Sequence, residues 1–134
     1  MYIPQAVAKV GRILTQNGKQ AFLVGGAVRD LLLTLAPQDW DIATDALPDE
    51  TTKYFLKAGC RVIPTGIKYG TVKVLIGPLS LEVTTFRTES RYQDYRHPDV
   101  VNFTDKISLD LKRRDFTINA LALNLAGEIG RAHV

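Results

Sequence analysis

The chain has 134 residues, of which 46% are hydrophobic and 23% charged, and this composition fits one globular domain. Its one cysteine, Cys60, excludes an internal disulfide framework and supplies too few thiols for a structural zinc site, so we expect a reducing, cytoplasmic environment. No apolar run approaches the roughly 20 residues that span a bilayer, so we expect no membrane association. The net charge of +3 permits a polyanionic partner without requiring one.

The first half of the chain predicts alternating helices and strands. In chain order these are a helix over 4–17, a strand over 21–25, a helix over 26–35, a strand over 40–44 and a helix from Pro48 to Gly59. Proline is tolerated at the first helical position and glycine is common after the last one, which sets the bounds of the third helix. Thr51, Phe55 and Ala58 share one face of that helix.

The second half begins with strands. A strand starts at Arg61, and the segments TVKVLI (71–76) and LSLEVTTF (79–86) alternate on either side of Gly77-Pro78, which predicts a β-hairpin. Apolar residues occupy one face of each hairpin strand, so Glu82 lies on the opposite face.

The remaining segments are polar or helical by pattern. Residues 87–106 are polar, basic and aperiodic, and a loop of this length favours a functional segment. Ser108 is suited to cap a following helix, and Phe116, Ala120 and Leu123 mark the face of a further helix.

Two aspartates at the second strand predict a metal site. Asp39 and Asp41 are two residues apart, so their side chains project from the same face, about 7 Å apart, while Trp40 and Ile42 point into the core. Oxygen ligands without histidine or cysteine suit Mg²⁺. The alternative is that the two aspartates are a solvated strand end.

The glycine pair before the second helix predicts a phosphate site. Gly25 and Gly26 allow the backbone to approach a phosphate closely, and Arg29 adds a positive charge for a triphosphate. The pair matches neither the P-loop pattern nor GxGxxG, and turn or packing chemistry is the alternative interpretation.

Taken together, these motifs resemble a known family. The segments are GGAVRD at 25–30, DWD at 39–41, the hairpin ending in LEVTTFR, the loop RTESRYQDYRHP, and RRDFTINAL at 113–121. They are similar to the head domain of class II tRNA nucleotidyltransferases and bacterial poly(A) polymerases, within the polymerase-β-like nucleotidyltransferase superfamily. The resemblance implies a mixed α/β fold, with a small sheet of about five strands flanked by helices, and two-metal nucleotidyl transfer that uses Mg²⁺.

The resemblance also implies roles for individual residues. The catalytic set is Asp39, Asp41 and Glu82, with Asp39 and Asp41 as the metal ligands. The nucleotide-binding set is Gly25, Gly26, Arg29, Asp30, Arg114, Asp115 and Asn119. The loop residues Arg91, Arg96 and His97 are candidates for RNA contacts, unless this loop is only a connector.

The segment TGIKYGTVKV (65–74) favours the tRNA-specific branch of the family, so we expect addition of C, A or both from CTP and ATP to the 3′ end of tRNA. The alternatives are a poly(A) polymerase head and a noncatalytic nucleotide- or RNA-binding module. Residues 1–129 correspond to the head, whereas 130–134 depart from the family pattern and need not be native. The neck, body and tail domains of the family do not fit in this length, so we expect weak or no turnover from the fragment alone.

Overall fold

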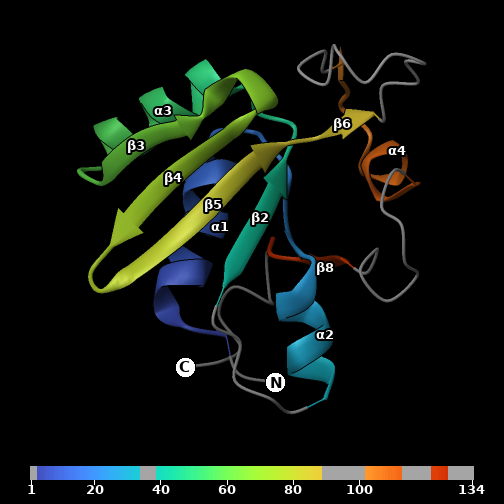
Figure 1. The fold of residues 1–134 in the computed structure, drawn as a ribbon. Helices are drawn as coiled ribbons and strands as arrows, with labels where there is room; N and C mark the ends of the chain where they lie inside the picture. Colours follow the sequence, from blue (N-terminus) through green and yellow to red (C-terminus); the bar gives the residue numbers. More distant parts are fainter. Residues whose placement is uncertain (1–2, 34–38, 89–101, 113–121, 127–134) are drawn as a thin grey trace.

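The computed structural model describes residues 3–33, 39–88, 102–112 and 122–126 (Figure 1). The helices are α1 (Gln5–Gln16), α2 (Gly26–Leu32), α3 (Pro48–Lys57) and α4 (Ile107–Lys112), with a 3₁₀ turn η1 (Ile67–Tyr69). The strands are β1 (Ala21–Val24), β2 (Trp40–Thr44), β3 (Arg61–Gly66), β4 (Thr71–Ile76), β5 (Leu79–Thr85), β6 (Arg87–Thr88), β7 (Asn102–Phe103) and β8 (Ala122–Asn124).

The main sheet is mixed and has six strands in the order β3-β4-β5-β2-β1-β8. Strands β2 and β5 pair in parallel, and the other described neighbours in this sheet are antiparallel. A second, two-stranded sheet pairs β6 with β7. The predicted mixed α/β fold is therefore confirmed, with one strand more in the main sheet than the expected five.

Helices α1 and α3 cover one face of the main sheet (Figure 1). Alternate residues of the central strands point toward them, among them Ile42, Val74 and Leu81, which are fully buried. Phe55 of α3 is buried in the same cluster. Each CH₂ group removed from water contributes about 0.8 kcal/mol, so this apolar layer supplies much of the folding free energy.

The opposite face of the sheet is covered only in part. Val24, Ala43 and Phe86 form a second, smaller cluster there, and Ile107 of α4 packs against it. Phe22 also joins this cluster, with its ring 6.1 Å from that of Phe86. The remaining part of this face, over β2, β5 and β4, carries polar side chains instead.

Most predicted elements of the first half are confirmed, but three expectations were wrong. Within the predicted loop 87–106, Arg87–Thr88 and Asn102–Phe103 form the paired strands β6 and β7. Ser108 lies inside α4, which begins one residue earlier at Ile107, so it is not the cap. Leu123 lies in β8 rather than in a helix, because pairing with β1 outweighs its local pattern.

Residues Phe116 and Ala120 of the predicted last helix lie outside the described residues. None of the helices in the described ranges is long and apolar enough to cross a membrane.

Candidate active site

Three carboxylates line one hollow on the open face of the sheet. Asp41 of β2 and Glu82 of β5 are direct neighbours in the parallel pairing, and side chains at paired positions share a face. Asp39 lies just before β2 and lines the same hollow as these two residues. Trp40 and Ile42 are 5% and 0% exposed, which confirms that the aspartates face away from the core.

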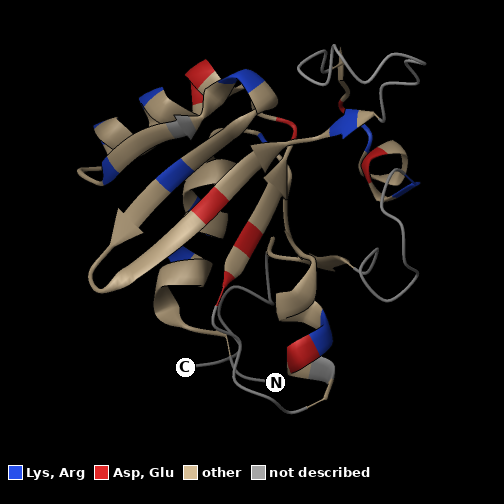
Figure 2. Cartoon of the chain, in the orientation of Figure 1, with Lys and Arg blue, Asp and Glu red and all other residues tan. Residues whose placement is uncertain are grey.

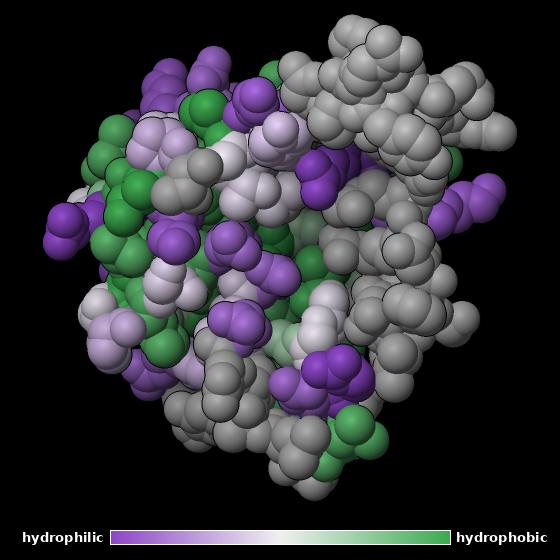
Figure 3. Space-filling model, in the orientation of Figure 1, coloured by the Kyte–Doolittle hydropathy of each residue, from purple (hydrophilic) through white to green (hydrophobic). Residues whose placement is uncertain are grey.

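Two adjoining hollows share Asp41 and Glu82 as part of their walls. The first has a volume of about 350 Å³ and is also lined by Asp39, Lys73 and Ser80. The second has a volume of about 250 Å³ and continues toward the far ends of β2 and β5. Figure 3 shows hydrophilic residues gathered over the middle of this face and again over α2. The volume of the first hollow lies within the range that is typical of sites for small ligands.

The glycine pair connects the carboxylates to Arg29. Gly25 follows β1 with a φ of +75°, a conformation that disfavours residues with a side chain, and it lies beside Asp41. The guanidinium of Arg29 lies over Gly26, where a Cβ atom would stand 3.3 Å from Nη2. A side chain at Gly26 would therefore crowd the guanidinium of Arg29, the group that we expect to bind a triphosphate.

Asp30 holds the arginine in place. Nε and Nη2 of Arg29 both donate to Oδ1 of Asp30, each at 3.1 Å. Both side chains remain partly accessible, with 42% and 22% exposure. The guanidinium thus keeps donors available for a ligand while its position is restricted.

Sequence reasoning did not select Lys73, although it lines the first hollow with the three acidic residues. Lys73 pairs directly with Glu82 across the hairpin of β4 and β5. A signal existed in the sequence, because the two-residue turn at Gly77-Pro78 fixes this register once the hairpin is accepted.

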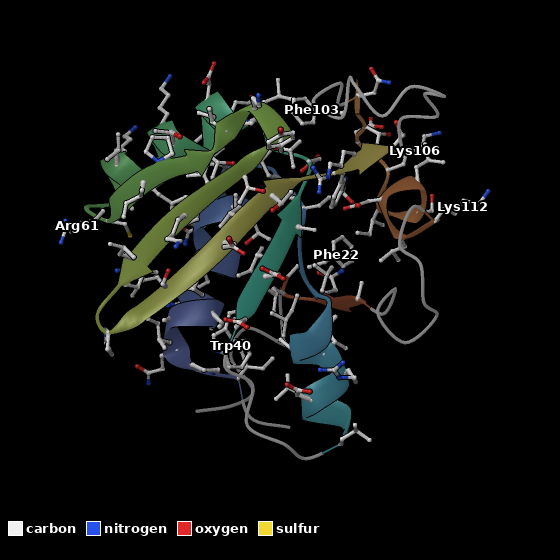
Figure 4. All side chains as sticks on the ribbon, viewed as in Figure 1. Phe22, Trp40, Arg61, Phe103, Lys106 and Lys112 are labelled. Carbon is white, nitrogen blue, oxygen red and sulfur yellow. The ribbon has the colours of Figure 1, made fainter. Side chains whose placement is uncertain are left out.

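At the end of the open face where β4 begins and β5 ends, a glycine and a phenylalanine pack together. Gly70 has a φ of +91°, and a Cβ atom there would lie 2.7 Å from Cε1 of Phe103. The ring of Phe103 therefore packs on the backbone of Gly70, near the ends of β4 and β5 (Figure 4). Arg87 donates from Nη1 to the carbonyl of Tyr69 at 3.0 Å, which ties β6 to the same turn.

The donor set fits a hard divalent cation that arrives with a phosphate ligand. In the described ranges, no group of three or more histidine, cysteine, aspartate or glutamate side chains is arranged to hold a metal ion unaided. Asp39 and Asp41 offer only oxygen atoms, and Mg²⁺ commonly uses one or two carboxylates together with water and substrate phosphates.

Six candidate residues from the sequence are not placed. Arg114, Asp115 and Asn119, and the loop residues Arg91, Arg96 and His97, lie outside the described residues.

A mixed sheet of this topology, with paired carboxylates on its open face beside a glycine turn, defines a nucleotidyltransferase fold of the polymerase-β-like class. Residues 21–130 match the family model of the poly A polymerase head domain, and the chain belongs to this family. The family that the motifs indicated is thereby confirmed.

Curated relatives are similar over most of this chain. The CCA-adding enzyme of Lactobacillus delbrueckii subsp. bulgaricus is 57% identical over 116 residues, which are 87% of this chain and 28% of that protein. The CCA-adding enzyme of Enterococcus faecalis is 52% identical over 122 residues, which are 91% of this chain and 29% of that protein. The chain therefore spans less than a third of the length of these relatives.

Solved structures are also similar to this chain over most of its length. A Bacillus stearothermophilus CCA-adding enzyme in complex with CTP has a TM-score of 0.77 at 41% identity, covering 90% of this chain and 27% of that one. A tRNA nucleotidyltransferase complexed with a primer tRNA and an incoming ATP analog has a TM-score of 0.66 at 35% identity, covering 87% of this chain and 31% of that one.

Proposed function

We propose that this chain is the catalytic head of a tRNA nucleotidyltransferase, which adds C, A or both from CTP and ATP to the 3′ end of tRNA. The observation that carries the proposal is the register of Asp41 with Glu82, in one hollow with Asp39 and beside the Gly25–Arg29 turn. The CCA-adding relatives support the tRNA branch over a poly(A) polymerase.

In the proposed reaction, the 3′ oxygen of the RNA forms a bond with the α-phosphorus of the nucleotide, and the bond from that phosphorus to the bridging oxygen breaks. Pyrophosphate leaves with the electron pair of the broken bond. Asp39 and Asp41 would hold two Mg²⁺ ions, and the bound ions would lower the pKa of the 3′-hydroxyl and offset the charge of the phosphates. The proton of the hydroxyl passes to Glu82, which is exposed beside Asp41, or to water if Glu82 would instead hold a metal ion.

The triphosphate binds at the turn before α2. Gly25 and Gly26 let the backbone approach the phosphates, and Arg29 donates charge-assisted hydrogen bonds to them. Asp30 contributes by orienting Arg29, to which it is bonded at 3.1 Å. We assign the remaining nucleotide contacts to Arg114, Asp115 and Asn119, and RNA contacts to Arg91, Arg96 and His97, from their motif positions.

We place this activity in the cytoplasm. Cys60 is a free, buried thiol, which fits a reducing compartment. The domain division stays a proposal as well: a head over residues 1–129, followed by five residues that depart from the family pattern.

The decisive experiment measures incorporation of labelled CTP and ATP by the protein expressed at the full length of its gene, with Mg²⁺. Three acceptors are compared: a tRNA lacking its terminal CCA, a tRNA ending in CC, and an unrelated oligoribonucleotide of similar length. We expect incorporation that is restricted to the two tRNAs and stops after the missing nucleotides. Long A tracts on every acceptor would instead identify a poly(A) polymerase, and tRNA or nucleotide binding without incorporation would identify a noncatalytic module.

A further inference from the structure

A lysine of the open face has no assigned role. Lys73 lies in the middle of β4, between Val72 and Val74, which are both fully buried. Because neighbouring residues of a strand point to opposite faces, the side chain of Lys73 projects to the open face. It is half-buried and lines the first hollow together with Asp39, Asp41 and Glu82.

The register places charged groups in a row across the sheet. Lys73 pairs with Glu82, and Glu82 pairs with Asp41, on three adjacent strands that are about 4.8 Å apart. Asp41 pairs in turn with Val24, the last residue of β1, and the chain then continues through the glycine turn to Arg29. Figure 2 shows this order as blue on β4, red on β5 and β2, and blue again on α2. The carboxylates thus lie between two cationic flanks.

The two flanking cations differ in their protein partners. Arg29 forms an ion pair with Asp30 at 3.1 Å. Lys73 forms no ion pair within 4 Å with any residue of the described ranges, although Glu82 is its cross-strand neighbour. A lysine that served only to neutralise Glu82 would be expected to contact it, so the ammonium group is suited to an anion brought by a substrate.

We propose that Lys73 binds the terminal phosphodiester of the RNA acceptor. This inference rests on the proposed function. In an in-line displacement the attacking and leaving oxygens lie on opposite sides of the phosphorus. If the pyrophosphate leaves on the Arg29 flank, the attacking RNA end approaches from the opposite flank of the carboxylates, where Lys73 is the basic residue that lines the first hollow. Lys73 on β4 would therefore lie beside the RNA acceptor, and Glu82 and Asp41 would lie between the acceptor and the nucleotide.

The test separates RNA binding from nucleotide binding in the full-length protein. Lys73→Met is compared with Lys53→Met, which removes an exposed lysine of α3 on the covered side of the sheet. Dissociation constants are measured for tRNA lacking CCA, without nucleotide or turnover, and for CTP alone. We expect Lys73→Met to weaken tRNA binding about tenfold. It should also reduce the slope of log K against log salt by about 0.7, as for one lost contact with a single-stranded phosphate.

The control variants sharpen this expectation. Affinity for CTP should stay within about twofold in Lys73→Met, Lys73→Arg should recover most of the tRNA affinity, and Lys53→Met should change neither constant. Arg29→Gln should give the mirror result, with CTP affinity reduced about tenfold and tRNA affinity retained. Equal thermal unfolding of all variants confirms that they are folded.

Two results would overturn the assignment of Lys73. A fall in CTP affinity with unchanged tRNA affinity would place the ammonium at the triphosphate, and two unchanged constants would leave it a structural charge beside Glu82. Failure of the proposed function would look different, because the unmodified protein itself would then incorporate no nucleotide into tRNA.

Discussion

The two faces of the main sheet are built from the same strands, but one is covered by helices and apolar, and the other is open and polar over the carboxylates. The covered face packs against α1 and α3, and its residues Ile42, Val74 and Leu81 are fully buried. On the open face, the residues next to them in sequence, among them Asp41 and Glu82, line the hollows. Because side chains alternate along a strand, chemistry and stability are separated by a single residue step. Substitutions on one face should therefore affect one property and spare the other.

The largest effect is expected on the open face. Asp39→Asn and Asp41→Asn preserve shape but remove the charge of a proposed metal ligand. The electrostatic help of a bound metal is worth several kcal/mol, so we expect the rate of nucleotide incorporation to fall about 10³-fold or more. The free energy of unfolding should change by no more than about 0.5 kcal/mol, as for other replacements outside the core. Turnover near the normal rate would reject these residues as metal ligands.

The covered face should show the reverse behaviour. Phe55 is fully buried, whereas its neighbour Leu56 on α3 is 57% exposed. Phe55→Ala should lower the free energy of unfolding by about 3–5 kcal/mol, because it leaves a cavity against the sheet. Leu56→Ala should change it by less than about 0.5 kcal/mol. Urea unfolding of the two variants makes this comparison, and equal losses would show that α3 does not bury the face we describe.

A smaller effect is expected where α1 touches the chain after β8. A Cβ atom on Gly11 would lie 2.8 Å from Cβ of Leu125, which is 1% exposed. Alanine favours a helix over glycine by about 1 kcal/mol, but overpacking costs about 1–3 kcal/mol, so Gly11→Ala should be destabilising by about 1 kcal/mol. Arg12→Ala at the adjacent exposed position is the control. A more stable Gly11→Ala variant would mean that Leu125 moves aside freely.

The smallest effect concerns the rim of the covered face. The backbone N–H of Leu47 donates to Glu50 at 2.9 Å and, with the ion pair to Lys19 at 3.4 Å, lowers the pKa of Glu50 from 4.5. A carboxyl with a lowered pKa contributes its full stability above its ordinary value and loses it as the pH falls through the lowered one. Glu50→Gln should therefore cost a few tenths of a kcal/mol at neutral pH, since the pair is partly exposed.

The same variant should equal the unmodified protein at acid pH, below the lowered pKa of Glu50. Urea unfolding at both pH values measures the difference. A gap between the two proteins that is as large in acid as at neutral pH would show that the charge of Glu50 is not its cause.

Short-range patterns in the sequence predicted much of the site. The alternation around Trp40 was enough to place Asp39 and Asp41 on the outer face, and the hairpin turn was enough to place Glu82 opposite the core. The same turn implied the pairing of Lys73 with Glu82, which sequence reasoning overlooked. Leu123 was misassigned because a three-residue strand leaves almost no periodic signal, and its partner β1 is distant in the chain.

Local patterns in the sequence were therefore sufficient to predict most strands of the main sheet, the polar side of β2 and β5, and the motifs that indicate the family. The tertiary fold places β2 and β5 side by side in parallel, which brings Asp41 next to Glu82. It also decided that α1 and α3 cover one face while the other stays open over the carboxylates. The physical reason is that alternation is a local property of a strand, whereas the choice of neighbouring strands depends on how the whole apolar surface is buried.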